Sequence, residues 1–284
     1  MSKNRLAKTK TILLRSLIYI ELGIVAIIVL YPILWIVSTS VDSVNNLART
    51  SLIPQGFTFD NFIRLMRETD FLAWYRNSAY IAVLTTFFSV LINTLTAFIF
   101  ARFKFKGKKA ALLSVMILQI FPSFMGMTAI FMIALNFGML DNLNMLIIIY
   151  VANSIPFNVW LIKGHLQNLP RSIDEAAYID GATKLQVFAK ILLPLSGPMI
   201  SFIALTSFIT PWMDYMLPRF LIRSSENQTV AIGLFLMSDT RSPNYDITAF
   251  CAGAIMIALP FAILYMVCQK FLITGLAAGA NKGE

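Results

Sequence analysis

Six apolar stretches, each near the length needed to cross a bilayer, divide this chain of 284 residues into spans and connecting segments. About 20 helical residues cross the hydrocarbon core, where backbone groups must be satisfied within the protein. The composition agrees, since 58% of the residues are hydrophobic and only 13% are charged, about half the charged fraction of an average soluble domain. We therefore expect an all-α integral membrane protein with six transmembrane helices. The expected spans are residues 17–37, 78–100, 111–135, 143–162, 195–217 and 247–271.

The first apolar stretch follows a basic segment, a pattern that signal peptides and signal anchors share. Residues 17–37 exceed the roughly 7 to 15 apolar residues of a secretory signal, and no A-x-A cleavage site follows them. We interpret this stretch as a retained span that begins in the cytoplasm.

The distribution of Lys and Arg predicts how the spans are oriented. Sixteen of the 23 basic residues fall in segments that six spans place on one side: five before the first span, five in residues 102–109, four around residues 163–190 and two near the C-terminus. Cytoplasmic segments carry this excess, so both termini should be cytoplasmic. Residues 102–109 alternate basic residues with Phe and could resemble a nucleic-acid patch. Between two spans, we interpret them as a cytoplasmic turn, and the net charge of +9 as a topology signal.

These boundaries give three parts. We expect a cytoplasmic N-terminal segment at 1–16, a six-span domain at 17–273 and a flexible cytoplasmic tail at 274–284. The fourth span contains Asn153, Ser154, Pro156 and Asn158, polar or helix-breaking residues that should face protein or water, not lipid.

The cytoplasmic segment 171–194 has the pattern of a folded helical elbow. Ser172 and Glu175 have the S-x-x-E spacing of a capping box, and Asp174 and Glu175 suit the positive end of a helix. Gly181 can adopt the left-handed conformation that ends a helix.

A second short helix is expected after this glycine, from Thr183 to Leu193. Pro194 should end it. Its apolar side is predicted to carry Leu185, Phe188, Ile191 and Leu192, with Lys184 and Lys190 turned toward water.

The elbow resembles the EAA loop of type I ABC importer permeases. The seven matching residues are Glu175, Ala176, Ala177, Gly181, Ile191, Leu193 and Pro194. The resemblance implies a cytoplasmic coupling helix that docks in a cleft of a partner ATPase. The alternative is an interfacial hairpin whose glycine is only a cap.

Three further stretches resemble the carbohydrate branch of these permeases, in particular the MalG-like maltose and maltodextrin subunits. They are Thr58–Phe62, with the form T-x-x-N-F; Trp212–Tyr215, similar to W-x-D-[FY]; and the tail Gly275–Gly283. Ala277 and Asn281 depart from the tail pattern. The resemblance implies transport of a sugar such as maltodextrin, or of another sugar or derivative, across a bacterial cytoplasmic membrane. It also implies three partners: a MalF-like second permease, a homodimeric ABC ATPase and an extracellular sugar-binding protein.

The same resemblance implies two further sets of contacts. Gly275, Gly279, Lys282 and Gly283 would form the tail contact with the ATPase. Trp212, Asp214 and Tyr215 are candidate sugar contacts, because an aromatic face and a carboxylate can stack on and accept from a sugar. The alternative is an aromatic belt at the outer interface, with Asp214 near Arg219.

Several kinds of chemistry are missing from the sequence. There is no P-loop motif, no assembled nucleophile and base, and no Cys or His neighbour that would make His165 a metal ligand. We expect no catalytic, metal or cofactor site in this chain, so that ATP hydrolysis would belong to a partner. The middle thirds of the spans lack charged residues, which disfavours an ion-coupled secondary carrier, the alternative class.

Overall fold

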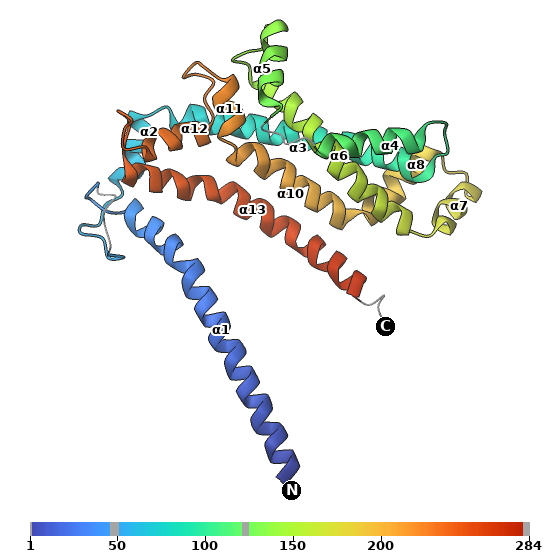
Figure 1. Ribbon diagram of the computed structural model, residues 1–284, viewed down its shortest axis with the longest axis horizontal. Coiled ribbons are helices and arrows are strands. Elements are labelled where there is room, and N and C mark those ends of the chain that lie inside the picture. Colours follow the sequence, from blue (N-terminus) through green and yellow to red (C-terminus); the bar gives the residue numbers. More distant parts are fainter. Residues whose placement is uncertain (1, 46–50, 121–124, 281–284) are drawn as a thin grey trace. The chain divides into compact units, whose positions relative to one another are not determined.

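A computed structural model describes the backbone of residues 2–45, 51–120 and 125–280, and the side chains of residues 13–45, 51–120 and 125–271. Regular structure in these ranges is helical, apart from one antiparallel bridge between Asp42 and Phe57. The predicted all-α class is therefore confirmed (Figure 1). The helices are α1 (Ser2–Ser40), α2 (Asp60–Glu68), α3 (Phe71–Arg102), α4 (Lys108–Ile117), η1 (Leu118–Ile120), α5 (Met127–Asn136), α6 (Leu143–Asn168), α7 (Arg171–Ile179), α8 (Lys184–Val187), η2 (Phe188–Leu192), α9 (Leu193–Leu195), α10 (Gly197–Met213), α11 (Met216–Leu221), α12 (Val230–Ser238) and α13 (Ile247–Ala280).

Four helical segments within the described ranges are long and apolar enough to cross a membrane. They are Leu13–Ser40 of α1, helices α3 and α6, and Ile247–Phe271 of α13. A fifth span is formed if α10 is joined to Lys184–Leu195, from which it is bent by 80°. The expectation of a continuous span over residues 195–217 is thus corrected: α10 has 17 residues, and the chain turns sharply at Ser196.

The expected span at residues 111–135 is not one continuous helix. Helices α4 and α5 have ten residues each, about 15 Å of helix, which is half the hydrocarbon thickness. Regular α-helix ends where η1 begins, at Leu118, four residues before Pro122. A proline ring clashes with the carbonyl four residues earlier, which accounts for a break at this point. Pro122 itself lies outside the described residues.

The chain divides into two compact units. The larger comprises residues 70–235 and 257–284, and the smaller comprises residues 1–69 and 236–256. In the larger unit α3, α6 and α10 pack against one another, with the α7–α8 elbow at one end of this layer and α11 at the other (Figure 1).

Two apolar clusters hold the larger unit together. The first joins α3, α6 and α11 through buried residues that include Ile81, Leu146 and Leu221. The second joins the other ends of α3 and α6 to the elbow, and its buried members are Ala97, Phe98, Ala101, Val159, Ile162, Leu166, Ala177, Val187, Phe188, Leu192 and Ile203. The elbow is therefore packed on the bundle and not suspended from it.

Two polar residues of α6, Ser154 and Asn158, face protein, as expected, whereas Asn153 is exposed. Ser154 Oγ accepts from Asn93 Nδ2 at 2.9 Å and donates to Ser89 Oγ at 3.1 Å, and both partners belong to α3. Asn158 is buried. Hydrogen bonds between spans satisfy polar side chains that would find no hydrogen-bond partner in lipid.

Asp141 ties the α5–α6 turn to the segment after α11. Its backbone is left-handed, with φ 58°. Its Oδ1 accepts from the backbone N–H groups of Arg223 and Ser224 at 3.0 and 3.1 Å, and its carbonyl accepts from Asn227 Nδ2 at 2.8 Å. Burial alone would raise the pKa of the Asp141 carboxyl, but these hydrogen bonds hold it below its ordinary value.

In the smaller unit, a polar network orders the segment after α1. Asp42 is fully buried and accepts from the backbone N–H of Gln55 at 3.3 Å, while Asn61 Nδ2 donates to the carbonyls of Ser40 and Asp42. Arg64 forms an ion pair with Asp246 at 3.0 Å.

Candidate functional site

The glycine of the elbow has the backbone conformation that the sequence predicts. Gly181 has φ 82°. The N–H of Gly181 donates to the carbonyl of Tyr178 at 3.1 Å, and the N–H of Ala182 donates to that of Ala177 at 2.9 Å. These are the two bonds of a Schellman motif, which satisfies the last carbonyls of α7. A left-handed turn at Gly181 is confirmed.

The capping box predicted at Ser172 and Glu175 is wrong. Helix α7 begins at Arg171 after Pro170, which makes no side-chain cap hydrogen bond. Pro170 occupies the N-cap position, so Ser172 lies inside the helix, where its side chain cannot act as the N-cap. The capping box lies instead at the next helix, where Thr183 and Gln186 bond each other's backbone N–H groups at 3.3 and 2.7 Å.

The second helix of the elbow differs from the regular helix that was expected. After four residues α8 widens into the π-helix η2, in which Leu193 N donates to Phe188 O, five residues earlier. In α8, before this wider turn, Leu185 is 68% exposed and Val187 is buried in its place. Phe188 and Leu192 are buried as predicted, and Pro194 lies inside α9 instead of ending the preceding turn.

The residues that match the EAA pattern are divided between two faces. Ala177 is buried in the cluster beneath the elbow, and Ile191 and Leu193 pack against that cluster. Glu175, Ala176, Gly181 and Pro194 are exposed. Large apolar side chains accompany them on the open surface, where Tyr178, Ile179 and Leu185 are 42%, 86% and 68% exposed.

An ion pair that the sequence did not predict joins the elbow to the bundle. Arg102, the last residue of α3, places Nε 2.6 Å from Oδ2 of Asp174 in α7. Arg102 Nη2 also donates to Asp174 Oδ1 and to the carbonyl of Leu169, each at 3.4 Å. The only sequence signal was a cation at the inner end of a span, which the positive-inside rule also explains.

The expected tail begins as helix. Helix α13 continues to Ala280, so Gly275 and Gly279 have helical backbone where a flexible tail was expected. The other two proposed tail residues, Lys282 and Gly283, lie outside the described residues.

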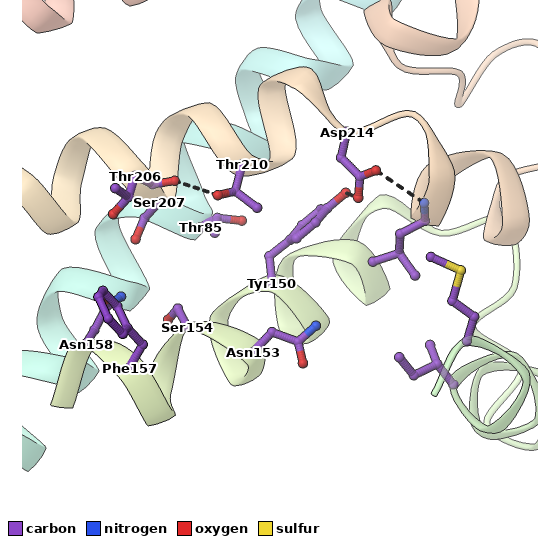
Figure 2. A pocket seen from close by; sticks show the side chains of 13 residues that line it. Thr85, Tyr150, Asn153, Ser154, Phe157, Asn158, Thr206, Ser207, Thr210 and Asp214 are labelled. Atoms are coloured by element: carbon purple, nitrogen blue, oxygen red, sulfur yellow. Dashed lines mark hydrogen bonds between the residues drawn. The ribbon is translucent and has the colours of Figure 1, made fainter. Parts of the chain in front are cut away.

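A cavity of about 420 Å³ opens between α3, α5, α6, α10 and α11 in the larger unit (Figure 2). Its polar lining comes from α3, α6 and α10: Thr85, Tyr150, Asn153, Ser154, Asn158, Thr206, Ser207, Thr210 and Asp214. Phe157, Met127, Ile130 and Leu217 supply apolar surface. Such a lining of hydroxyls, amides, one carboxylate and two aromatic rings suits a neutral polyhydroxylated ligand.

Asp214 is the one of three expected sugar contacts that lines this cavity. It accepts a hydrogen bond from Tyr150 Oη at 2.8 Å (Figure 2). It also caps α11 by accepting from Met216 N at 2.8 Å. Arg219, expected beside Asp214, lies instead with Phe131 and Arg223 at a separate depression.

Trp212 and Tyr215 are placed away from the cavity. Trp212 is 1% exposed, stacks on Phe208 and donates from Nε1 to the carbonyl of Ile257 at 2.9 Å. Tyr215 packs on Phe235, with ring centroids 4.3 Å apart. The ring of Trp212 is therefore packed within the protein and its N–H has a protein acceptor, so Trp212 is not available to a ligand in the cavity.

The class of protein follows from these features: a multi-pass helical membrane protein with an elbow packed at one end of its helices and a polar cavity among them. A family model described as "Binding-protein-dependent transport system inner membrane component" matches residues 93–277, more than half of the chain. The chain belongs to this family, and the matched segment includes the elbow and the residues that line the cavity, apart from Thr85.

Curated relatives agree over nearly the full length. The chain is 40% identical over 279 residues to the maltodextrin transport system permease protein MdxG of Bacillus subtilis, covering 98% of this chain and 99% of that protein. It is 38% identical over 269 residues to the galactooligosaccharides transport system permease protein GanQ of the same organism, covering 93% and 94%. It is 37% identical over 280 residues to the maltodextrin permease protein MalD of Streptococcus pneumoniae, covering 99% and 100%.

A solved structure has the same fold. A chain of a bacterial ABC transporter involved in the import of the acidic polysaccharide alginate superposes with a TM-score of 0.79 at 25% identity, covering 89% of this chain and 94% of that chain. The protein is therefore a permease component of an ABC importer in a bacterial inner membrane, and not itself an enzyme.

Proposed function

We propose that this chain is a permease subunit for import of a sugar, with maltodextrin or a related oligosaccharide as cargo. Relatives named for maltodextrins and galactooligosaccharides support the class of cargo. In this proposal a MalF-like second permease completes the pathway, a homodimeric ABC ATPase hydrolyses ATP, and an extracellular binding protein delivers the sugar. The chain itself binds no cofactor.

The observation that carries the coupling role is the two-faced elbow. Ala177 and Val187 anchor it in the bundle, while Ile179 and Leu185 remain open. Exposed apolar side chains on a rigid protruding helix pair support docking into a partner cleft. Glu175, Ala176 and Gly181 belong to this docking surface, and Ile191, Leu193 and Pro194 connect it to α10. Helix α13, with Gly275 and Gly279 near its end, carries the additional tail contact to the ATPase.

The sugar passes this subunit at the cavity. Asn153, Asn158 and Thr210 can exchange hydrogen bonds with sugar hydroxyls, and the carboxylate of Asp214 can accept from them. Phe157 offers an apolar face for the pyranose ring. A lining with one carboxylate and no Lys or Arg suits an uncharged cargo better than an anionic one.

Both termini are cytoplasmic in this proposal. Reporters fused near Gly56 and Gln228 should then lie outside the membrane, and those near Gly107, Asp180 and Lys282 inside it. An external signal at Asp180 would exclude docking of the elbow to a cytoplasmic ATPase.

The function is tested by purifying the chain with its partner subunits and measuring which sugars stimulate ATP hydrolysis in the presence of the binding protein. Maltodextrins should stimulate it, and uptake into vesicles should stop when the ATPase is inactivated. Uptake that continues without ATP hydrolysis but collapses with an ionophore would identify an ion-coupled carrier instead.

A further inference from the structure

A second cleft, of about 460 Å³, lies between the start of α4 and the last turns of α6. Lys108, Lys109 and Lys163 line it, together with Gln167 and Phe105. The cleft is separate from the polar cavity, with which it shares no lining residue.

The feature that needs an explanation is Lys163, whose side chain is buried at 9% exposure and lines this cleft. Its Nζ lies 4.6 Å from the centroid of the Trp160 ring. Within the described side chains, no carboxylate lies within 4.0 Å of Nζ and no hydrogen bond to it is formed. A buried ammonium has three donors, and a ring face can engage only one of them. The remaining donors are open to whatever occupies the cleft.

The groups around Lys163 concentrate positive charge further. Burial, followed by the nearby charges of Lys163 and Arg171, lowers the pKa of Lys108. Lys108 and Lys109 are also the first two residues of α4, a helix of ten residues whose N-terminus carries partial positive charge. Gly107 precedes them with φ 83°, and Ala110 completes this end of the cleft. The N-terminus of α4, its two lysines and Lys163 of α6 together supply the positive charge and N–H donors that bind a phosphate group.

The depth of the cleft in the membrane indicates the molecule that would carry this phosphate group. Lys163 is five residues before the end of α6, about 7 to 8 Å along the helix axis. Trp160, about one turn closer to the middle of α6, is 41% exposed, and exposed Trp is enriched where hydrocarbon meets headgroups. The cleft therefore opens where phospholipid headgroups lie.

We propose that the cleft formed by Lys108, Lys109, Lys163 and the N-terminus of α4 binds the phosphate of an anionic phospholipid. The lipid's negative charge neutralises Lys163, and its acyl chains follow the apolar surface beside Trp160. Basic pockets between transmembrane helices recognise anionic headgroups in this way.

The test uses the chain purified in mild detergent together with the subunits that accompany it. Bound lipids are identified by native mass spectrometry, before and after titration with phosphatidylglycerol or phosphatidylcholine. Lys163→Gln removes the buried charge, and Lys163→Arg keeps it. Lys106→Gln is the matched control, because Lys106 is an exposed lysine of the same turn that does not line the cleft.

The wild type, Lys163→Arg and Lys106→Gln should retain phosphatidylglycerol in preference to phosphatidylcholine, and Lys163→Gln should lose that preference by about tenfold. Equal retention by wild type and Lys163→Gln would overturn the site. A parallel thermal-shift titration with inorganic phosphate separates the two sources of the anion. Stabilisation of the wild type by free phosphate, without preferential phosphatidylglycerol binding, would overturn the assignment to lipid.

Discussion

Arg102 at the end of α3 and Asp174 in α7 form an ion pair with Nε and Oδ2 2.6 Å apart, and their side chains are only 7% and 9% exposed. The two residues are 72 positions apart in the sequence. Through this pair, a span of the bundle and the first helix of the elbow are fixed to each other. If the elbow docks on an ATPase, as proposed above, this pair is a direct link from α7 to α3.

Breaking this pair should be costly for both folding and coupling. Arg102→Met leaves Asp174 as a buried uncompensated charge, which costs about 3 to 5 kcal/mol, so we expect a reduced amount of protein in the membrane. The double variant Arg102→Met with Asp174→Leu removes both charges and should restore the membrane level. It should still show lower sugar-stimulated ATP hydrolysis, because the link between α3 and α7 is lost.

The Arg64–Asp246 pair provides a control, since its side chains are 38% and 19% exposed. Arg64→Met should have a milder effect on protein level. Full stimulation in the Arg102→Met and Asp174→Leu double variant would show that the buried pair stabilises the fold without contributing to coupling.

A side chain at Gly181 should weaken the elbow without unfolding the bundle. A Cβ built at Gly181 meets nothing within 4 Å, so that the cost comes from the left-handed backbone alone. This cost is about 1 to 2 kcal/mol, and more for a β-branched residue. We expect Gly181→Val to reach the membrane normally and to copurify with less ATPase.

Gly138 is the matched control for this experiment. It has φ 64° and equally open surroundings, but it lies in the turn between α5 and α6. Gly138→Val carries the same backbone strain and should retain its ATPase. Normal ATPase retention and uptake in Gly181→Val would contradict the coupling role of the elbow.

The two ends of the elbow should respond differently to loss of polar side chains. Glu175 makes no cap hydrogen bond in α7 and is exposed, so Glu175→Ala should leave the stability of the elbow unchanged. Gln186 closes the capping box of α8, and Gln186→Ala should cost about 0.5 to 2 kcal/mol. Hydrogen exchange of α7 and α8 amides measures these effects. Loss of uptake in Glu175→Ala without faster exchange would assign Glu175 to a partner contact.

Local chemistry made part of this elbow predictable. Gly181 could be predicted because a left-handed helix end depends on one residue and its neighbours. The start of α7 was mispredicted because Pro170 occupies the cap position, and a matching S-x-x-E spacing does not reveal which residue the helix begins at. The exposure of Leu185 was mispredicted. This residue precedes the π-turn, and the apolar pattern alone did not show that Val187 would be the side chain of α8 that packs on the bundle.

Long-range pairings were beyond the reach of sequence patterns. Polar residues in the fourth span predicted that α6 faces protein, but not that Ser154 would meet Asn93 or that Tyr150 would meet Asp214. Trp212 was grouped with Asp214 because the two resemble the W-x-D-[FY] pattern and because an aromatic ring and a carboxylate suit a sugar. Helix α10 ends at Met213 and Asp214 has extended backbone, so the two side chains are not held on one helix face.

Asp141 should make the turn between α5 and α6 sensitive to acid. Because the pKa of its carboxyl is lowered in the folded protein, its stabilising effect is present above the ordinary aspartate pKa and is lost as the pH falls through the lowered value. Asp141→Asn keeps an acceptor and tolerates the left-handed backbone, but it cannot ionise. The wild type should be the more stable at neutral pH in thermal melts, and the difference should close below about pH 3.8. A difference that is independent of pH would contradict this role for the carboxylate.

The cavity residues Tyr150 and Asp214 test whether this subunit contacts the sugar. Asp214→Asn retains an oxygen for the N–H of Met216 and an amide that can donate to Tyr150 Oη, so the variant should fold while losing the charge. If the carboxylate accepts from a sugar hydroxyl, KM for uptake should rise about tenfold, which corresponds to the loss of one charge-assisted hydrogen bond of roughly 1.5 kcal/mol.

Trp212→Phe is the contrasting variant, because Trp212 does not line the cavity. This change removes the hydrogen bond from Nε1 to the carbonyl of Ile257. It should lower the melting temperature of the purified protein and leave KM unchanged. An unchanged KM in Asp214→Asn, with normal protein level, would remove Asp214 from the sugar path and leave it as the cap of α11.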